Sequence, residues 1–263
     1  EGVLTGKSLL WGGSLVRKEA TGYGCVYFAQ EMLADKGLEL AGRDCLVSGG
    51  GNVAIYVIDK LYQCGARPIT CSDSTGTIHD PDGIRLETLK SLKEVEKIGL
   101  AEYVRRHAGA RFIPHGDYPE DGHAVWRIPG ELAFPCATQN ELTRADAEAL
   151  VNNGCIAVSE GANMPSTPDA ADLLLDAKML YGPGKAANAG GVATSQFEMA
   201  QNASMQRWTF EQIDTQLKAI MADIYARARD TALKYDAPGN LVLGANVAGF
   251  IRVADAMIEQ GLV

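Results

Sequence analysis

The fold of this chain is decided by the stretch Asp44-Cys-Leu-Val-Ser-Gly-Gly-Gly-Asn-Val-Ala54. A short, largely apolar run comes first, and three glycines follow it almost at once. After the glycines, apolar side chains recur at helical spacing at Ile55, Ile58 and Leu61. This order predicts a buried strand, a tight turn and a helix.

The spacing Gly49-x-Gly51-x-x-Ala54 gives each small residue a physical role. Gly49 permits a tight turn, Gly51 lets the backbone approach a pyrophosphate, and Ala54 lets the helix pack closely on the sheet. The free N–H groups at the start of the helix then face the anion. Three adjacent glycines also occur in ordinary loops, so the interpretation depends on the residues that follow.

Those residues complete a β-α-β unit. Gly65 is a helix stop signal, and residues 68–71 form a second apolar run that ends in the polar sequence Ser72-Asp73-Ser74. This unit is the context that the glycine pattern requires. By its position at the end of the second strand, Asp73 is an acceptor for a ribose hydroxyl, and its charge would repel a 2′-phosphate.

The composition is that of an ordinary globular α/β protein, with 46% hydrophobic residues, 22% charged residues and 29 glycines in a chain of 263. The net charge of −9 disfavours nucleic acid as a partner and favours small molecules or other subunits. There is no uninterrupted apolar run of about 18 residues and no cationic-apolar leader, so we expect neither a membrane span nor a secretory signal. Because the chain opens at Glu1 without Met, the missing leader is a weak argument.

Cysteine usage favours a reducing compartment. None of the cysteines forms a C-x-x-C pair, and the six are Cys25, Cys45, Cys64, Cys71, Cys136 and Cys155. Cys45 and Cys71 fall inside predicted strands, where a buried thiol is the expected state. These features lead us to expect a cytoplasmic protein.

The rest of the chain alternates helix and strand patterns. A helix is predicted from Thr21, which can cap it, to Gly37. The other predicted helices are residues 86–95, 143–151, 173–176, 208–234 and 246–260. The other predicted strands are residues 111–113, 131–134, 156–158 and 179–181. This alternation predicts an α/β fold with a doubly wound, mainly parallel, Rossmann-like sheet and long C-terminal helices.

Two features between the first β-α-β unit and the strand predicted at residues 131–134 are expected to be structural only. After residues 76–79, the sequence Asp80-Pro-Asp-Gly83 predicts a turn, and the charged helical stretch that follows places Lys90, Lys93 and Lys97 on a solvated face. His115 and His123 lie in an irregular segment with no carboxylate arranged beside them. We therefore expect loop histidines and no metal site.

Five motifs, in this order, resemble the hexameric glutamate dehydrogenases of the Glu/Leu/Phe/Val dehydrogenase superfamily. They are Arg17-Lys-Glu-Ala-Thr-Gly-Tyr-Gly24, Ser48-Gly-Gly-Gly-Asn-Val-Ala54, Pro135-Cys-Ala-Thr-Gln-Asn140, Glu160-Gly-Ala-Asn-Met-Pro165 and Asn188-Ala-Gly-Gly-Val-Ala-Thr-Ser195. The resemblance implies reversible oxidative deamination of L-glutamate to 2-oxoglutarate and ammonia, by hydride transfer to a nicotinamide cofactor. It also implies a homo-hexamer for the full-length parent.

The resemblance covers only the second, coenzyme-binding domain of that family. The family's catalytic lysine and aspartate belong to an N-terminal substrate domain, and no matching segment precedes Glu1, so no catalytic residue is assigned here. Residues 1–20 are then a connection from that domain, residues 21–240 the dinucleotide-binding domain, and residues 241–263 a helix that returns to the substrate domain. The chain alone is expected to bind cofactor without turnover, and the apolar face of its last helix to be exposed.

The resemblance assigns most of the site residues to the cofactor. The implied cofactor-binding residues are Arg17, Thr21, Gly49, Gly51, Asn52, Val53, Ala54, Ser72, Asp73, Ser74, Ala137, Thr138, Asn163 and Asn188. Val192 and Ser195 correspond to the pair that meets the substrate side chain, where a hydroxyl can donate to the γ-carboxylate of glutamate. From the residues alone, Ser195 could equally cap or pack a helix.

For the choice between NADP and NAD, the argument from the position of Asp73 and the argument from the family resemblance disagree. The position of Asp73 favours NAD, whereas Ser72-Asp73-Ser74-Thr-Gly76 resembles the NADP-using bacterial members. We expect NADP, with NAD as the alternative. One of Lys90, Lys93 or Lys97 could offset the acidic charge if its helix folds back.

Two departures and two alternatives remain open. Lys18 stands where the family usually has proline, and Gly50 where serine or alanine is commoner, so the chain entry and the turn are expected to be looser. A leucine, phenylalanine or valine dehydrogenase would have an apolar contact in place of Ser195. A catalytically silent nucleotide-binding module would bind cofactor without any turnover.

Overall fold

A five-stranded parallel sheet lies at the centre of the chain, and the computed structural model describes residues 2–261 of it. The strand order is β2-β1-β6-β7-β8. The strands are β1 (Asp44–Val47), β2 (Arg67–Pro68), β6 (Leu132–Phe134), β7 (Ala157–Ser159) and β8 (Leu180–Gly182). The prediction of a mainly parallel sheet is confirmed.

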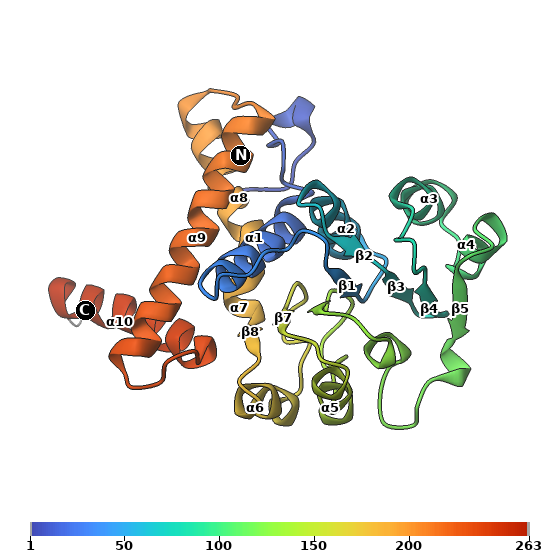
Figure 1. Cartoon of the computed structure of the whole chain (residues 1–263). Coiled ribbons are helices and arrows are strands. Elements are labelled where there is room, and N and C mark those ends of the chain that lie inside the picture. The colour runs from blue at the N-terminus through green and yellow to red at the C-terminus, as the bar shows by residue number, and fades with distance from the viewer. Residues whose placement is uncertain (1, 262–263) are drawn as a thin grey trace.

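Helices cover both faces of this sheet (Figure 1). On one side lie α1 (Ala20–Ala34) and α2 (Asn52–Gln63), and on the other α5 (Arg144–Asn152) and α6 (Pro168–Asp176). Alternate residues of β1 serve the two faces, as the strand period requires. Cys45 and Val47 belong to the core that includes α1 and α2, and Leu46 to the second core that includes α5 and α6. The fold is therefore doubly wound.

The predicted turn at residues 80–83 is present, but a three-stranded antiparallel sheet beside it was not predicted. This sheet pairs β3 (Thr70–Asp73) with β4 (Gly76–His79), and β4 with β5 (Arg111–Pro114). The predicted second strand is divided, because β2 joins the parallel sheet and β3 joins the antiparallel one. A connection of two residues, Ser74 and Thr75, turns β3 into β4, so the polar segment hides a hairpin.

The helix predicted at residues 86–95 is present and changes from α to π geometry at Ser91. It consists of α3 (Leu86–Lys90) and a π-helical turn η2 (Ser91–Glu96), and α4 (Ala101–Arg106) follows after a short loop. Short 3₁₀ turns lie at η1 (Leu9–Trp11), η3 (His115–Asp117) and η4 (Ala124–Arg127). This segment and the antiparallel sheet form one end of the molecule in Figure 1.

Thr21 does not cap the first helix. α1 begins one residue earlier, at Ala20, whose amide already donates to the carbonyl of Val16, and Glu19 occupies the N-cap without a side-chain hydrogen bond. Thr21 therefore lies in the first turn with its hydroxyl free of a capping role. The reason is that the backbone before Thr21 is already helical, since Glu19 has helical dihedral angles.

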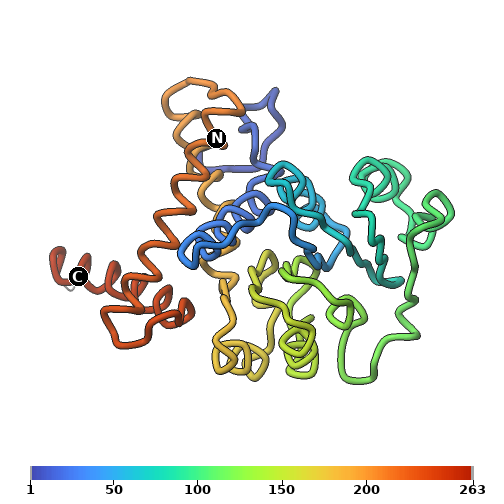
Figure 2. Tube along the Cα trace, in the orientation of Figure 1, coloured from blue at the N-terminus to red at the C-terminus, as the bar shows by residue number. Residues whose placement is uncertain are grey.

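The C-terminal part of the chain is helical, and two of its four helices, α7 and α8, are not predicted by the sequence. It consists of α7 (Gly184–Ala187), α8 (Gly190–Ser204), α9 (Phe210–Lys234) and α10 (Leu241–Gln260). The pair Gly190-Gly191 at the start of α8 reads as loop sequence, because glycine disfavours helix. The N-terminal segment runs beside α8, where Gly6 donates its amide to Glu198 at 2.9 Å (Figure 2).

Helix α10 extends from the body of the molecule and leaves an apolar face exposed (Figure 1). Phe250 is 72% exposed and Ile258 79% exposed. By length and composition α10 could cross a membrane, with a mean hydropathy of 1.6, although a single helix of this kind is weak evidence. A search for an uninterrupted apolar run misses it because Asn246 and Arg252 interrupt the pattern.

The contact between α1 and α2 depends on Gly22, and its substitution gives a test of the packing. A Cβ on Gly22 would lie 2.6 Å from the amide nitrogen of Val57, in the backbone of α2. We expect Gly22→Ala to lower the free energy of unfolding in urea by about 1–3 kcal/mol, because two helix backbones must separate.

Gly249 in α10 is the matched control, since a Cβ there meets nothing within 4 Å. Gly249→Ala should leave stability unchanged or raise it by up to about 1 kcal/mol through helix propensity. Equal stability of the two variants would contradict the close packing of α1 on α2.

Candidate functional site

The site lies where the chain leaves β1 and β6, two adjacent parallel strands. The glycine turn of residues 48–51 follows β1, and the polar loop of residues 135–141 follows β6. From β1 the chain crosses to β2 on one side, whereas β6 leads to β7 on the other. Such a switch point opens a crevice at the carboxyl ends of the strands, which is where α/β folds bind ligands.

The glycine turn is held from both sides by hydroxyl groups. Gly49 has a φ of +86°, in the left-handed region, and a Cβ there would lie 2.9 Å from the carbonyl oxygen of Cys136. Its amide donates to Ser72 Oγ at 2.8 Å. On the other side, the amide of Cys136 donates to Ser48 Oγ at 2.8 Å. The turn therefore requires glycine and is fixed to the loops beside it.

The start of α2 is open for an anion. Gly51 is the N-cap, and a Cβ on it would meet nothing within 4 Å, so that space is free in front of the first turn. The first turn of α2 carries no acidic side chain, and Ala54 is fully buried where the helix meets the sheet. Asn52 donates its side-chain amide to the carbonyl of Lys18 at 2.6 Å. Unpaired amides at a helix N-terminus with free space before them suit a phosphate group.

Two cavities flank the glycine turn and share part of their lining. The first, of about 540 Å³, contains Gly49, Gly51, Asn52, Ser72, Asp73 and Ser74. The second, of about 550 Å³, contains Thr21, Asn163, Asn188 and Val192. Both are lined by Val53, Cys136, Ala137 and Thr138. Most of the predicted site residues therefore line one or both of these two neighbouring cavities.

Lys93 is paired with Asp73, which corrects the expectation of a solvated lysine face. Lys93 Nζ lies 2.8 Å from Asp73 Oδ2, and the lysine side chain is only 23% exposed. Burial acts to raise the pKa of Asp73, but hydrogen bonds from Lys93 and Thr75 outweigh it, and the pKa is lowered. The stem of Lys93 passes the glycine turn, with Cε 3.5 Å from a Cβ built on Gly50. The helix of residues 86–96 therefore folds back toward the end of β3, whereas Lys97 remains exposed.

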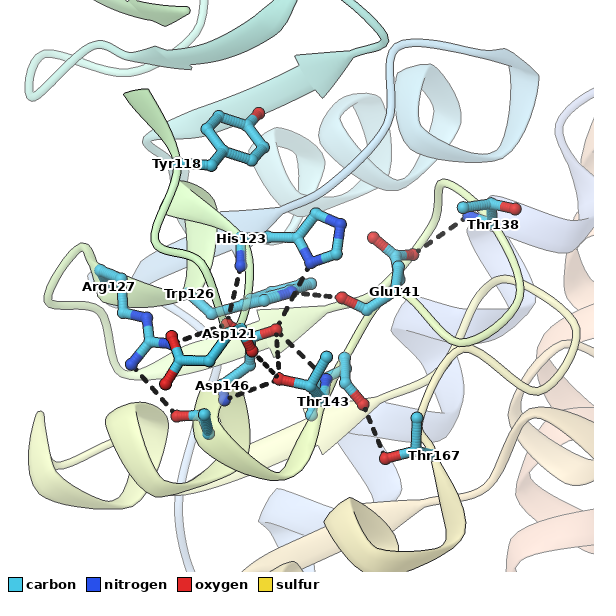
Figure 3. A network of polar contacts seen from close by, with 12 residues as sticks. Tyr118, Asp121, His123, Trp126, Arg127, Thr138, Glu141, Thr143, Asp146 and Thr167 are labelled. Atoms are coloured by element: carbon cyan, nitrogen blue, oxygen red, sulfur yellow. Dashed lines mark hydrogen bonds and ion pairs between the residues drawn. The ribbon is translucent and has the colours of Figure 1, made fainter. Parts of the chain in front are cut away.

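His123 has a carboxylate beside it, contrary to the sequence prediction. Its Nδ1 lies 3.4 Å from Asp146 Oδ2 (Figure 3). Asp146 is fully buried at the start of α5, where it forms a capping box with Thr143. The hydrogen bond to Asp146 raises the pKa of His123. A single sequence does not reveal this pairing, because 23 residues separate the two partners. Within residues 2–261 no group of three or more His, Cys, Asp or Glu side chains is arranged to hold a metal ion.

Glu141 is a site residue that the sequence prediction missed. It lines the first cavity although it is 3% exposed, and its Oε1 accepts the amides of Ala137 at 2.8 Å and Thr138 at 3.3 Å. Burial raises the pKa of the Glu141 carboxyl to about 7, against the opposing effect of the Ser48 hydroxyl and the two amides. The only signal for it in the sequence is its place directly after the Pro135–Asn140 motif.

A second buried carboxylate, Glu160, shapes the other cavity. It accepts the hydroxyl of Tyr181 at 2.7 Å and the amide of Gly184 at 2.6 Å, and so joins the loop after β7 to the start of α7. Within that framework Asn188 donates its side-chain amide to Asn163 Oδ1 at 2.8 Å. The two predicted asparagines therefore meet directly.

Arg17 and Ser195 lie outside the lining of both cavities. Arg17 borders a neighbouring cavity of about 540 Å³ together with Asn52, and its Nε is buried without a hydrogen-bond partner. Ser195 is in the second turn of α8, where it donates to the carbonyl of Gly191 at 3.2 Å. Thr5, which was not predicted, donates to Ser195 Oγ at 3.3 Å. Val192, three residues before Ser195, is 64% exposed.

The family model described as Glutamate/Leucine/Phenylalanine/Valine dehydrogenase matches residues 12–261. The chain belongs to this family. Among its similar relatives is an NADP-specific glutamate dehydrogenase from Helicobacter pylori, 56% identical over 262 residues. An NAD(P)-specific glutamate dehydrogenase from Xylanibacter ruminicola is 50% identical over 265 residues.

A solved structure supports the fold of this dehydrogenase-family chain. The crystal structure of Plasmodium falciparum glutamate dehydrogenase superimposes with a TM-score of 0.93 at 45% identity, over 99% of this chain and 55% of that one. The two curated relatives are matched over all of this chain but only 58% of their own length. The chain thus spans somewhat more than half of the proteins it resembles.

Proposed function

We propose that this chain is the cofactor-binding part of a glutamate dehydrogenase, which deaminates L-glutamate reversibly to 2-oxoglutarate and ammonia. The observation that carries the proposal is the pair of cavities that meet at the Gly49–Ala54 turn. Their linings suit a dinucleotide that places one half in each cavity and its pyrophosphate at the start of α2. When bound, the nicotinamide supplies the acceptor for the hydride. The names of the relatives from Helicobacter pylori and Xylanibacter ruminicola support glutamate as the substrate.

The first cavity is proposed for the adenosine half, and NADP is the proposed cofactor. Asp73 and Ser74 are placed for the ribose, as the position at the end of the second Rossmann strand implies. An unpaired Asp73 would repel a 2′-phosphate, but the ion pair with Lys93 brings the local charge close to neutrality. Ser72 would contribute indirectly, by holding the glycine turn in place, because its Oγ already accepts a hydrogen bond from the Gly49 amide. NAD remains the alternative.

The second cavity is proposed for the nicotinamide half. Thr21, Asn163 and Asn188 offer hydroxyl and amide groups that can orient a carboxamide, and orientation can remove several kcal/mol from a transfer barrier. Val53, Ala137 and Thr138 line the passage between the halves, and Arg17 is proposed to approach from the cavity beside Asn52. Val192 and Ser195 are proposed for the substrate side chain. A hydroxyl at Ser195 suits a γ-carboxylate better than an apolar substrate side chain.

The proposed division of the chain follows the lengths of the relatives. Residues 1–20 would connect to a substrate domain, residues 21–240 form the dinucleotide-binding unit, and residues 241–263 return toward that domain; Glu1 and residues 262–263 lie outside the described residues. The apolar face of α10 is the support for its return. A homo-hexamer for the full-length protein and a cytoplasmic location are part of the proposal. All six cysteines are free thiols, as a reducing compartment favours.

The proposal is tested by cofactor binding and turnover. We expect the purified 263-residue chain to bind NADPH in a fluorescence titration and to show no glutamate-dependent reduction of NADP. The full-length protein that carries this sequence should oxidise glutamate. Faster turnover of leucine than of glutamate by that protein would favour the branched-chain alternative, and a chain that binds neither NADP nor NAD would rule the proposal out.

The ion pair at the end of β3 predicts the cofactor preference. Lys93→Ala leaves the charge of Asp73 unopposed near the ribose, so NADP binding should weaken by about tenfold or more while NAD binding changes little. The ratio of the two dissociation constants, measured by calorimetry, is the readout. Lys97→Ala, at an exposed position, is the matched control. If the ratio of the NADP and NAD dissociation constants is unchanged in Lys93→Ala, Lys93 does not determine the choice between the two cofactors.

The exposed apolar face of α10 predicts that this chain binds apolar molecules at its surface. We expect the 263-residue chain to bind a hydrophobic dye, because Phe250, Val253 and Met257 together line an open apolar hollow on the surface of α10. The double variant Phe250→Ser, Val253→Ser should lose most of that dye fluorescence without loss of NADPH binding. A wild-type chain that is a monomer and binds no dye would contradict the proposed docking of α10.

A further inference from the structure

The first cavity is lined by two carboxylates, and only one of them has a cation as its partner. Asp73 pairs with Lys93 at 2.8 Å. Glu141 is 3% exposed, and among residues 2–261 no lysine, arginine or histidine lies within ion-pair distance of its carboxylate. A buried negative charge without a cation beside it is costly to maintain. The cavity proposed to receive a polyanion therefore already contains one uncompensated negative charge.

This charge is joined directly to the glycine turn. Ser48, the first residue of that turn, hydrogen-bonds to the Glu141 carboxylate through its hydroxyl, and its Oγ accepts the Cys136 amide at 2.8 Å. Two more donors fix the carboxylate to its own loop, because Oε1 accepts the amides of Ala137 and Thr138 (Figure 3). Only the Ser48 side chain thus separates Glu141 from the backbone proposed to bind the pyrophosphate.

The hydrogen bonds around Glu141 are compatible with an ionised and with a protonated carboxyl. The amides of Ala137 and Thr138 can donate to Oε1 in both states, because the carbonyl oxygen of a protonated carboxyl is also an acceptor. The Ser48 hydroxyl can donate to a carboxylate and can accept from a protonated carboxyl. Proton uptake therefore requires no rearrangement of this loop or of the turn.

Three titratable side chains near Glu141 come from its own loop and from the segment before η4. The loop contributes Cys136, and the segment contributes Tyr118 and His115, whose rings lie 4.9 Å apart. Burial raises the pKa of Tyr118 and of Cys136, so neither is charged near pH 7. These neighbours give Glu141 no compensating charge.

His123 is the neighbour whose positive charge favours the ionised form of Glu141. Its Nδ1 lies 3.4 Å from Asp146 Oδ2, and that hydrogen bond raises the pKa of the imidazole. Asp146 also lies 3.4 Å from Arg127. The charge of His123 is thus directed at another carboxylate. Burial outweighs the effects of the histidine and of the hydrogen bonds, and it raises the pKa of Glu141 to about 7.

We propose that Glu141 takes up one proton from the solvent when the dinucleotide binds, because the pyrophosphate brings negative charge to the turn that Ser48 joins to this carboxylate. The inference rests on the proposed function and adds a proton to its binding equilibrium. A nearby charge of the same sign disfavours the ionised form, so the bound phosphates raise the carboxyl pKa above its value in the free chain.

The coupling makes the affinity for the cofactor decrease as the pH rises. Well below pH 7 Glu141 is protonated with and without cofactor, so its charge does not oppose binding. As the pH rises through 7, the free chain loses the proton first, and the affinity falls by up to about tenfold per pH unit. The fall ends above the pKa of the complex, where the carboxylate is ionised in both states.

The proton is counted by calorimetry of NADPH binding at pH 7.5, in two buffers that differ in ionisation enthalpy. Glu141→Gln is the test variant, because it keeps an oxygen for the amides of Ala137 and Thr138 and, like the protonated carboxyl, has no charge. We expect the wild-type 263-residue chain to take up about 0.5 proton more per NADPH than the variant. The comparison of the two chains cancels the titration of the 2′-phosphate, whose pKa is about 6.

The pH dependence of the affinity gives a second readout. Wild type and Glu141→Gln should bind NADPH equally at pH 6, whereas at pH 8.5 the variant should bind it several-fold more tightly. A merely structural role for Glu141 would weaken binding by the same factor at both pH values, which would overturn the inference. An equal proton count in the two chains would also overturn it while leaving the proposed function intact, and a wild-type chain that does not bind NADPH would overturn both.

Two further variants assign the proton to its residue. Glu160→Gln is the matched control, because Glu160 is equally buried and also accepts a backbone amide but does not line the first cavity. Its proton count should equal that of the wild-type chain, whatever happens to the affinity. His123→Gln should also retain the uptake. Loss of the uptake in His123→Gln together with its persistence in Glu141→Gln would place the proton on the histidine and overturn the inference.

Discussion

The site depends on a single constraint, which is that the backbone after β1 must turn sharply with no side chain in the way and yet stay fixed. Gly49 supplies the left-handed turn, and the hydroxyls of Ser72 and Ser48 tie that turn to the ends of β3 and β6. Glycine is the residue most costly to order, so the hydrogen bonds on either side offset its freedom. Both cavities take their shape from this fixed turn.

Buried carboxylates extend the same principle to the irregular loops around the turn. Loops that enclose a ligand contain backbone amides with no strand or helix partner, and these need acceptors. Glu141 accepts two amides in the loop after β6, and Glu160 accepts the amides of Ser166 and Gly184. A charged acceptor gives stronger hydrogen bonds than a neutral one, which helps to offset the cost of its burial. The loops are thus rigid without being regular.

The parts that sequence could predict are those whose signals are local. The strand, glycine turn and helix of residues 44–63 lie within one short stretch, and the alternation of apolar runs was enough for a doubly wound sheet. The predictions that failed concern elements whose local sequence suggests another structure, and side-chain pairs whose partners lie far apart in the sequence. β4 was hidden by a polar hairpin connection, α8 by its glycine pair, and the pairs Asp73–Lys93 and His123–Asp146 by separations of 20 and 23 residues. No pattern in a single sequence reports which side chain folds back onto another.

Asp73 shows why such a pair can reverse a rule based on position. An acid at the end of the second strand argues for NAD when it is considered alone, because it repels a 2′-phosphate. With Lys93 at 2.8 Å and both side chains largely buried, the phosphate would meet a nearly neutral pair with an ammonium on one side. Electrostatic interactions are strongest where water is excluded, so the lysine matters more there than on a solvated face. The lysine is brought beside Asp73 and the glycine turn by the path of the helix from Leu86 to Glu96, and no local sequence signal reports that path.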